Sequence, residues 1–274
     1  MKVFSQFLSY FLPILYLGLI YVYYAIFSGK KKSWTNRTTL FLSLLLIIHA
    51  LEIAVRHIAL KTIPLSTTHD ALSFLAFSIL FVYMILEFSI KNRGSGLFIL
   101  FFATILELVS TLNLTWEPET NELLTNPTFA IHASLSIMGY TAMSLSALYA
   151  IMYMIQNYNI KKRQLGKLFT QLPALSYLEK MSIRSAFIGI ILLGIGILLG
   201  HMEAEALIGE FWPKDIKVIA TDIIWALYVV GYLLARIMKW HGKKMAYLSM
   251  AAYFILIVGG TLAIYLSETF HEFN

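Results

Sequence analysis

Four ionisable side chains lie together in one long apolar run of this chain, between residues 38 and 58. They are His49, Glu52, Arg56 and His57, and the first three are separated by three and then four residues. In a helix this spacing places His49, Glu52 and Arg56 on one face, where we expect Glu52 and Arg56 to form an ion pair. The residues leave two interpretations open: a polar clasp between packed helices, or a proton or cofactor site.

A second set of imidazoles lies at the ends of other apolar runs. His132 opens one run, His201 ends another, and His271 follows the last. Haem iron takes two neutral imidazole nitrogens on opposite faces of a flat apolar ring, which also needs aromatic walls and cations for its propionates. The residues available for these tasks are Trp116, Phe211, Trp212, Trp225, Phe270, Arg56, Lys61, Lys214 and Lys217. The alternative interpretation is the ordinary aromatic belt at a membrane surface.

The composition indicates that most of this chain is solvated by lipid. Of its 274 residues, 59% are hydrophobic and 13% are charged, whereas a soluble domain carries roughly 25% charged residues. Cysteine is absent, which excludes disulfides, thiolate metal sites and covalent attachment of haem to this chain. The net charge of +6 comes mainly from short basic loops, so membrane topology rather than nucleic-acid binding explains it.

Apolar runs long enough to cross a bilayer as helices recur along the chain and predict an all-α polytopic membrane protein. We expect about eight transmembrane helices in a single bundle that includes residues 1–274. They lie near residues 7–27, 38–58, 71–90, 97–114, 129–156, 185–200, 218–237 and 245–267. The first run is expected to be a retained span and not a signal peptide, and Leu45 in the second is expected to face lipid. Regularly spaced leucines in 164–184 predict an amphipathic stretch on the membrane surface.

The distribution of lysine and arginine predicts the orientation of these spans. If the N-terminus lies outside, the inner loops hold 16 of the 21 basic residues. These loops are 28–37, 91–96, 157–184 and 236–244. The positive-inside rule then places both termini on the outer, periplasmic or extracytoplasmic side. His132, His201 and His271 are expected on that same side.

The segment 200–236 reads GHMEAEALIGEFWPKDIKVIATDIIWALYVVGYLLAR. It resembles the tryptophan-rich, so-called WWD segment of the haem-handling membrane proteins that include CcsA, CcmC and HemX. Their pattern is roughly WGxxWxWDPKE, followed by a span with an interior tryptophan that ends in YLHxR. This chain keeps Gly209, Trp212, Asp215, Lys217, Trp225, Tyr232 and Arg236. It departs from the pattern at Ile208 and Lys214, where the family has tryptophan, at Ile216, where it has proline, and at Leu233 or Leu234, where it has histidine.

Three further segments agree with this family in order and spacing. Arg56, followed by PLSTTHDAL at 64–72, is similar to an arginine followed by FPLSNLYESL in CcsA. The segment IHA at 131–133 and the apolar run after it are similar to HVxxxxLSYAxxxxxxxxAxxYLI, and 266–271 occupies the place of the closing GLHSY. The resemblance covers most of the chain from about residue 50 to 274 and includes the eight-span plan of HemX and related short members.

The resemblance also implies a haem site. In that family, one outer histidine before the WWD segment and one after it are thought to bind the iron, and by position these are His132 and His271. The other residues that the resemblance implies for the cofactor site are Trp212, Asp215, Trp225 and Arg56. The rival ligands are His201, on the same side, and His49 or His57 within the membrane.

We therefore expect a protein that binds b-type haem non-covalently, and transiently, at the outer face of the inner (cytoplasmic) cell membrane during cytochrome c-type biogenesis. It is expected to act as a haem chaperone or synthase subunit rather than as an enzyme alone. The resemblance implies a CcsB-like partner membrane protein and apocytochrome c, and no nucleic acid. Two alternatives stay open: a HemX-like non-catalytic regulator of haem biosynthesis, and a haem b or quinone subunit of a respiratory membrane complex.

Overall fold

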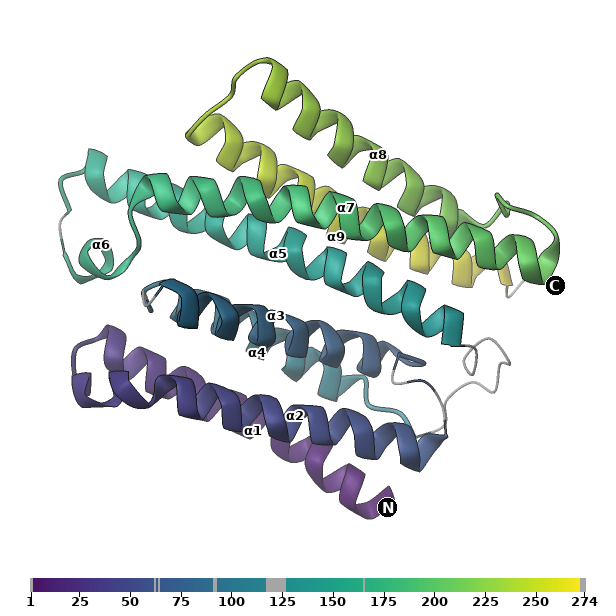
Figure 1. Ribbon diagram of the computed structural model, residues 1–274, viewed down its shortest axis with the longest axis horizontal. Helices are drawn as coiled ribbons and strands as arrows, with labels where there is room; N and C mark the ends of the chain where they lie inside the picture. Colours follow the sequence, from purple (N-terminus) through teal and green to yellow (C-terminus); the bar gives the residue numbers. More distant parts are fainter. Residues whose placement is uncertain are drawn as a thin grey trace. The chain divides into compact units, whose positions relative to one another are not determined.

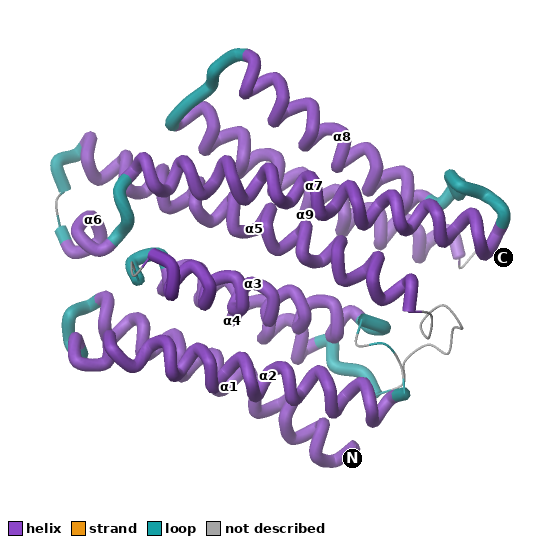
Figure 2. The backbone as a smooth tube through the Cα atoms, in the orientation of Figure 1, coloured by secondary structure: helices purple, strands orange, loops and turns teal. Residues whose placement is uncertain are grey.

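A computed structural model describes residues 2–61, 63, 65–90, 93–116, 127–164 and 166–271. Throughout these ranges every regular element is a helix (Figures 1 and 2). The chain divides into two compact units. Unit 1 consists of Met1–Asn126 and Tyr158–Pro173, and unit 2 of Pro127–Asn157 and Ala174–Asn274. The single bundle expected for 1–274 stays a prediction.

Unit 1 is built on four long helices that run back and forth. They are α1 (Lys2–Phe27), α2 (Thr38–Leu60), α3 (Thr68–Ile90) and α4 (Gly96–Leu112). A short 3-10 helix, η1 (Lys32–Arg37), precedes α2, and the short helix α6 (Lys167–Gln171) also belongs to this unit. Side chains from all four long helices meet in its interior, including Tyr16, Leu42, Leu80 and Leu100, which are at most 1% exposed.

Unit 2 contains most of α5 (Pro127–Lys161) together with α7 (Leu175–Ile208), α8 (Ile216–Ile237) and α9 (Lys243–His271). Its core is formed by Met143, Leu193, Tyr228 and Leu256, one from each helix. α5 and α7 approach closely at glycines, because a Cβ atom at Gly139 would lie 2.8 Å from the backbone nitrogen of Leu193. Small residues at such crossings are typical of helices packed in membranes.

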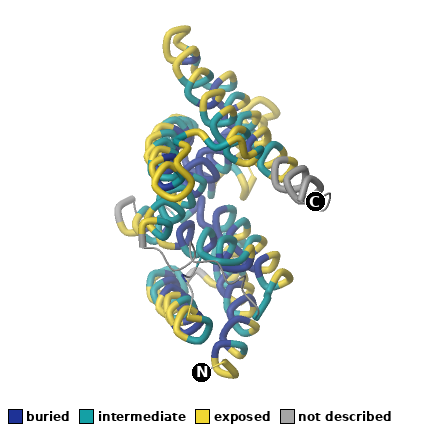
Figure 3. The backbone as a smooth tube through the Cα atoms, turned by 90° about the vertical axis from the view of Figure 1, so that its right-hand side faces the viewer, coloured by how far each residue is buried: buried dark blue, intermediate teal, exposed yellow. Residues whose placement is uncertain are grey.

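The helices have the length and composition of membrane spans. Among the described residues, seven helices are long and apolar enough to cross a bilayer, and α4 is a shorter apolar helix of 17 residues. Each of the eight predicted runs thus coincides with one helix, and the chain is a multi-pass membrane protein. Exposed residues follow the outer sides of the helices (Figure 3), and many are large and apolar, such as Ile47 at 65% and Phe254 at 66% exposure. Lipid is the solvent that makes such exposure favourable.

One expectation about an individual residue was wrong, and one predicted run is part of a longer helix. The run predicted at 185–200 lies within α7, whose first turns are formed by residues 175–184, and the surface location expected for 164–184 stays a prediction. Pro173 and the extended Ala174 precede that helix, and its 34 residues span about 51 Å at 1.5 Å per residue, well beyond a hydrocarbon core of about 30 Å. Leu45, expected to face lipid, is only 4% exposed. Leu45 stands four residues before His49 and seven before Glu52, so it shares the buried face of these two side chains.

Candidate functional site

A cavity of about 280 Å³ lies among α5, α7 and α8 within unit 2. Two of the histidines singled out in the sequence, His132 on α5 and His201 on α7, line it together. A cation, Lys217, and a carboxylate, Asp222, enter it from α8. The remaining lining residues are Ser136, Tyr140, Leu193, Ile197, Gly200, Ala204, Pro213, Val218 and Thr221. The cavity therefore combines two imidazoles, one cation, one carboxylate and apolar walls.

The tryptophan segment is held between the ends of two helices beside this cavity. Gly209 ends α7 in the left-handed conformation, with φ of 74°, and its N–H donates to the carbonyl of Glu205 at 3.0 Å. Asp215 begins α8, where its carboxylate accepts from the N–H of Lys217 at 2.6 Å. Glycine at the end of a helix and aspartate at the start are the residues favoured at these positions. Asp215, predicted as a cofactor residue, acts here as a helix cap.

The ring of His132 is held in one orientation by α7. Its Nδ1 lies 2.6 Å from the carbonyl oxygen of Gly196. A carbonyl oxygen can only accept, so Nδ1 carries the proton, and in the neutral ring Nε2 then bears the free lone pair. Gly200 makes room for the ring, because a Cβ atom there would lie 2.6 Å from His132 Cε1. This is the arrangement usual for histidines that bind metals, whose second nitrogen donates to a protein oxygen.

His201 is engaged differently. Its Nε2 lies 3.2 Å from both carboxylate oxygens of Asp222, and its ring contacts the rings of Phe211 and Trp212 at centroid distances of 5.3 and 5.6 Å. The imidazole therefore connects α7 to α8 and to the tryptophan segment. Asp222 was missed in the sequence, although an acidic residue inside the apolar run 218–237 was a usable signal.

The other predicted site residues of unit 2 lie outside the lining of the cavity. Trp212 is 68% exposed and packs at right angles against Phe211. Trp225 donates from its indole N–H to the carbonyl oxygen of Ile190 at 2.9 Å, so it joins α8 to α7. The side chain of His271 lies outside the described residues, and its predicted part in the site stays a prediction.

Arg56 belongs to unit 1, where it connects the last turns of α2 to the first turn of α3. Its Nε donates to Asp70 Oδ1 at 2.5 Å, and both side chains are 3% exposed. Its Nη2 donates to the carbonyl oxygen of Thr115 at 2.8 Å, and its guanidinium lies 4.8 Å from the centre of the Trp116 ring. The expected ion pair with Glu52 was wrong, because Asp70, on the neighbouring helix, takes that position.

Glu52 and His49 are buried, as predicted, in a hydrogen-bonded network inside unit 1. Glu52 accepts from Ser9 at 2.6 Å, while His49 contacts the Tyr16 hydroxyl through Nδ1 at 2.9 Å and the Ser73 hydroxyl through Nε2 at 2.8 Å. Both nitrogens of His49 are therefore occupied. This favours the polar clasp over a ligand role for His49.

Two further histidines, His57 and His69, belong to unit 1. His69 is 1% exposed, and its Nδ1 lies 2.8 Å from the hydroxyl of Ser110. His57 is exposed near the end of α2. Among the residues that the structure describes, no group of three or more His, Cys, Asp or Glu side chains is arranged to hold a metal ion. An iron held in a porphyrin needs only one or two protein ligands, so this finding does not bear on haem.

Known proteins resemble this chain over a region that includes the tryptophan segment and the helices on either side of it. The family described as Cytochrome C assembly protein matches residues 65–271, more than half of the chain. A cytochrome c biogenesis protein CcsA of Porphyra purpurea is 24% identical over 305 residues, with 94% of this chain and 93% of that protein covered. Protein HemX of Bacillus subtilis (strain 168) is 25% identical over 217 residues, with 77% of each chain covered. A CcsA of Heterosigma akashiwo is 24% identical over 247 residues, with 77% of this chain and 76% of that protein covered.

Proposed function

Because this chain belongs to the cytochrome c assembly protein family, we propose that its role in cytochrome c biogenesis is to bind haem and present it at the outer face of the cell membrane. The site proposed for this is the cavity of unit 2 beside the tryptophan segment. Haem is bound there non-covalently, since the chain has no cysteine to attach it. In this proposal it is held only until it is passed on.

The observation that carries this proposal is the state of His132. Its Nδ1 is fixed on the carbonyl oxygen of Gly196, so its Nε2 is left with the free lone pair, and the residue lines the cavity. Nε2 has no hydrogen-bond partner in the described part of the chain. A histidine that served only packing would gain from pairing both nitrogens, as His49 does.

The other residues of the cavity suit the rest of a haem. Lys217 offers a cation for a propionate, and Leu193, Ile197 and Val218 offer apolar surface for the ring. A volume of about 280 Å³ is just below the range of ligand cavities, roughly 300 to 1000 Å³, so a porphyrin would lie partly outside it. Partial enclosure suits a ligand that is passed on. When bound, haem would supply the iron and vinyl groups that the maturing cytochrome needs.

The second ligand in this proposal is His271, as the family resemblance implies. Trp212, which is 68% exposed, provides an aromatic surface beside the cavity, while Asp215 and Trp225 hold the segment and α8 in place. Arg56 is assigned to the structure of unit 1, since its Nε and Nη2 already have partners. His201 is assigned to positioning, because its Nε2 is held by Asp222.

Forming the covalent bonds to an apocytochrome requires thiols that this chain lacks. We therefore propose that it acts with a CcsB-like membrane protein and with apocytochrome c, as a chaperone or synthase subunit in the inner membrane. This part of the proposal is supported by the likeness to proteins named as cytochrome c biogenesis proteins.

A second candidate function is favoured by the likeness to protein HemX. In it, the chain regulates haem biosynthesis through contact with other proteins, and the cavity takes no haem during that work. The third possibility, a subunit with permanent haem b or quinone, requires two histidines that face each other across helices near one depth, and His49 is disfavoured as one of them because both of its ring nitrogens are paired.

The test is a haem titration of the full chain purified in mild detergent, followed by its visible spectrum in the oxidised and reduced states. We expect saturable binding of one haem, with the split bands of a low-spin iron and two imidazole ligands. A chain that takes up no haem above the level of empty detergent micelles would contradict the proposal and favour the regulator.

A further inference from the structure

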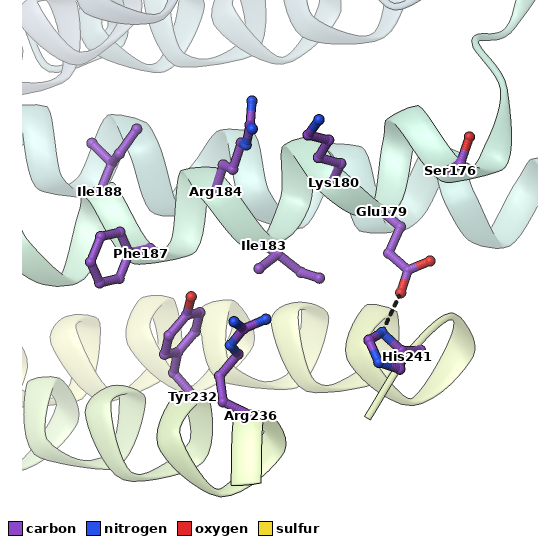
Figure 4. A pocket seen from close by; sticks show the side chains of 10 residues that line it. All are labelled: Ser176, Glu179, Lys180, Ile183, Arg184, Phe187, Ile188, Tyr232, Arg236 and His241. Atoms are coloured by element: carbon purple, nitrogen blue, oxygen red, sulfur yellow. Dashed lines mark ion pairs between the residues drawn. The ribbon is translucent and has the colours of Figure 1, made fainter. Parts of the chain in front are cut away.

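A larger cavity, of about 550 Å³, lies between the first half of α7 and the end of α8 in unit 2. Figure 4 shows Tyr232 and Arg236 pointing from α8 toward Ile183 and Phe187 on α7. The proposed haem site uses none of these residues. The cavity is therefore a separate feature of the same unit.

The charges around this cavity are predominantly positive. Lys180, Arg184 and Arg236 line it, all three are exposed, and none of their side chains has a hydrogen-bond or ion-pair partner in the described part of the chain. The acid beside them, Glu179, already accepts from the N–H of Gly242 at 2.6 Å and lies 3.6 Å from His241 Nδ1. These three exposed cations have no counter-ion among the described residues, and together they attract anions to this cavity.

The other wall of the cavity is apolar. Phe187 and Tyr232 are stacked with a centroid distance of 5.9 Å, and Ile183 and Ile188 continue the surface along α7. Lys180 and Arg184 project from α7 in the opposite direction in Figure 4. Their side chains are long and exposed, so they can turn a charged end toward a ligand while their stems stay on apolar surface.

The position along the helices indicates the depth of the cavity in the membrane. α8 has 22 residues, about 33 Å at 1.5 Å per residue, which matches a hydrocarbon core of about 30 Å. Arg236, the second-last residue of α8, is therefore at the level of the lipid headgroups. Basic pockets between transmembrane helices at this level bind anionic headgroups.

We propose that this cavity binds one anionic phospholipid of the surrounding bilayer. Arg236, with Lys180 and Arg184, pairs with the headgroup phosphate, and an acyl chain lies along Ile183, Phe187 and Tyr232. The site does not depend on haem binding, so it stands or falls separately from the proposed function.

The test is native mass spectrometry of the full chain in mild detergent, titrated with phosphatidylglycerol or with phosphatidylcholine of the same acyl chains. We expect phosphatidylglycerol to bind more tightly. Arg184→Gln, Arg236→Gln and Lys180→Gln should each weaken that binding about fivefold, which is about 1 kcal/mol per charge at 1.4 kcal/mol per tenfold. The double variant Arg184→Gln/Arg236→Gln should weaken it about 25-fold.

The matched control is Arg37→Gln/Lys244→Gln, which removes two exposed cations that lie outside the cavity lining. It should bind phosphatidylglycerol within about twofold of the unmodified chain. Equal loss in both double variants would show general charge attraction and overturn the proposal. Displacement of the lipid by inorganic phosphate would identify a free-anion site, and displacement by added haem would identify a second haem site; either result would also overturn it.

Discussion

The buried pair of Arg56 and Asp70 gives the sharpest test of the packing in unit 1. Arg56 Nε donates to Asp70 Oδ1 at 2.5 Å, with both side chains 3% exposed. Asp70 Oδ2 also accepts from the N–H of Thr67 at 3.0 Å, and the N–H of Asp70 donates to the Thr67 hydroxyl at 3.1 Å. This reciprocal exchange is a capping box at the start of α3. One carboxylate therefore fixes both the helix start and the arginine.

The expected magnitudes follow from what each variant leaves behind. Arg56→Met leaves Asp70 buried without its cation, and removing one member of a buried pair costs about 3–5 kcal/mol. Asp70→Asn keeps an oxygen that can accept from the N–H of Thr67, so the helix cap, worth about 1 kcal/mol, is retained. It leaves Arg56 charged and poorly paired, however, which should cost about 3 kcal/mol of unfolding free energy. In the double variant Arg56→Met/Asp70→Asn no buried charge is left unpaired. Its loss of unfolding free energy should therefore be about 2–3 kcal/mol smaller than the sum of the two single losses.

The assay is equilibrium unfolding in mixed detergent micelles, followed by far-ultraviolet circular dichroism. Leu44→Phe is the control, because Leu44 is 47% exposed and lies on the same helix; its effect should stay within about 0.5 kcal/mol. If the two single losses add within about 0.5 kcal/mol, Arg56 and Asp70 do not act as a pair, and the account of this end of the unit is wrong.

Three further predictions concern topology and the haem site. Reporter fusions should report the inner side after the basic loops and the outer side elsewhere, and a consistent reversal would overturn the orientation. The fusion points are Lys31, Lys162 and Lys243 for the inner side, and Glu119 and Asn274 for the outer. Gly200→Ala should weaken haem binding about tenfold with unchanged circular dichroism, because its Cβ would lie 2.6 Å from His132 Cε1 and displace that ring; unchanged affinity would show that the ring is not positioned this way. His201→Ala should leave the haem low-spin, since Asp222 already holds its Nε2; a high-spin spectrum would make His201 the ligand.

The helices could be predicted from the sequence because lipid forces each backbone to satisfy its own hydrogen bonds. An apolar run bounded by charge therefore has few alternatives to a helix. The first turns of α7 could not be predicted in this way, because residues 175–184 are mixed in polarity and do not form an apolar run, although they belong to the helix. The burial of His49, Glu52 and Arg56 also followed, since polar groups spaced by three and four residues must turn away from lipid together.

The partners of these side chains could not be predicted, because they lie on other helices. Arg56 and Glu52 share a face of α2, yet Arg56 pairs with Asp70 of α3 and Glu52 with Ser9 of α1. Helix spacing says which residues share a face and nothing about the opposing helix. The same limit hid the contact between Asp222 and His201, which depends on how α7 and α8 pack.

The central claim is that His132 binds haem in the cavity of unit 2. The most direct measurement is the visible spectrum of the haem-loaded chain, compared with His132→Ala, His271→Ala and the double variant. We expect the low-spin bands to be lost in each variant, and to return in part in His132→Ala when imidazole fills the vacated position. His49→Ala should keep the bands, because His49 is paired at both nitrogens within unit 1. Low-spin haem retained in the His132→Ala/His271→Ala chain would contradict the claim.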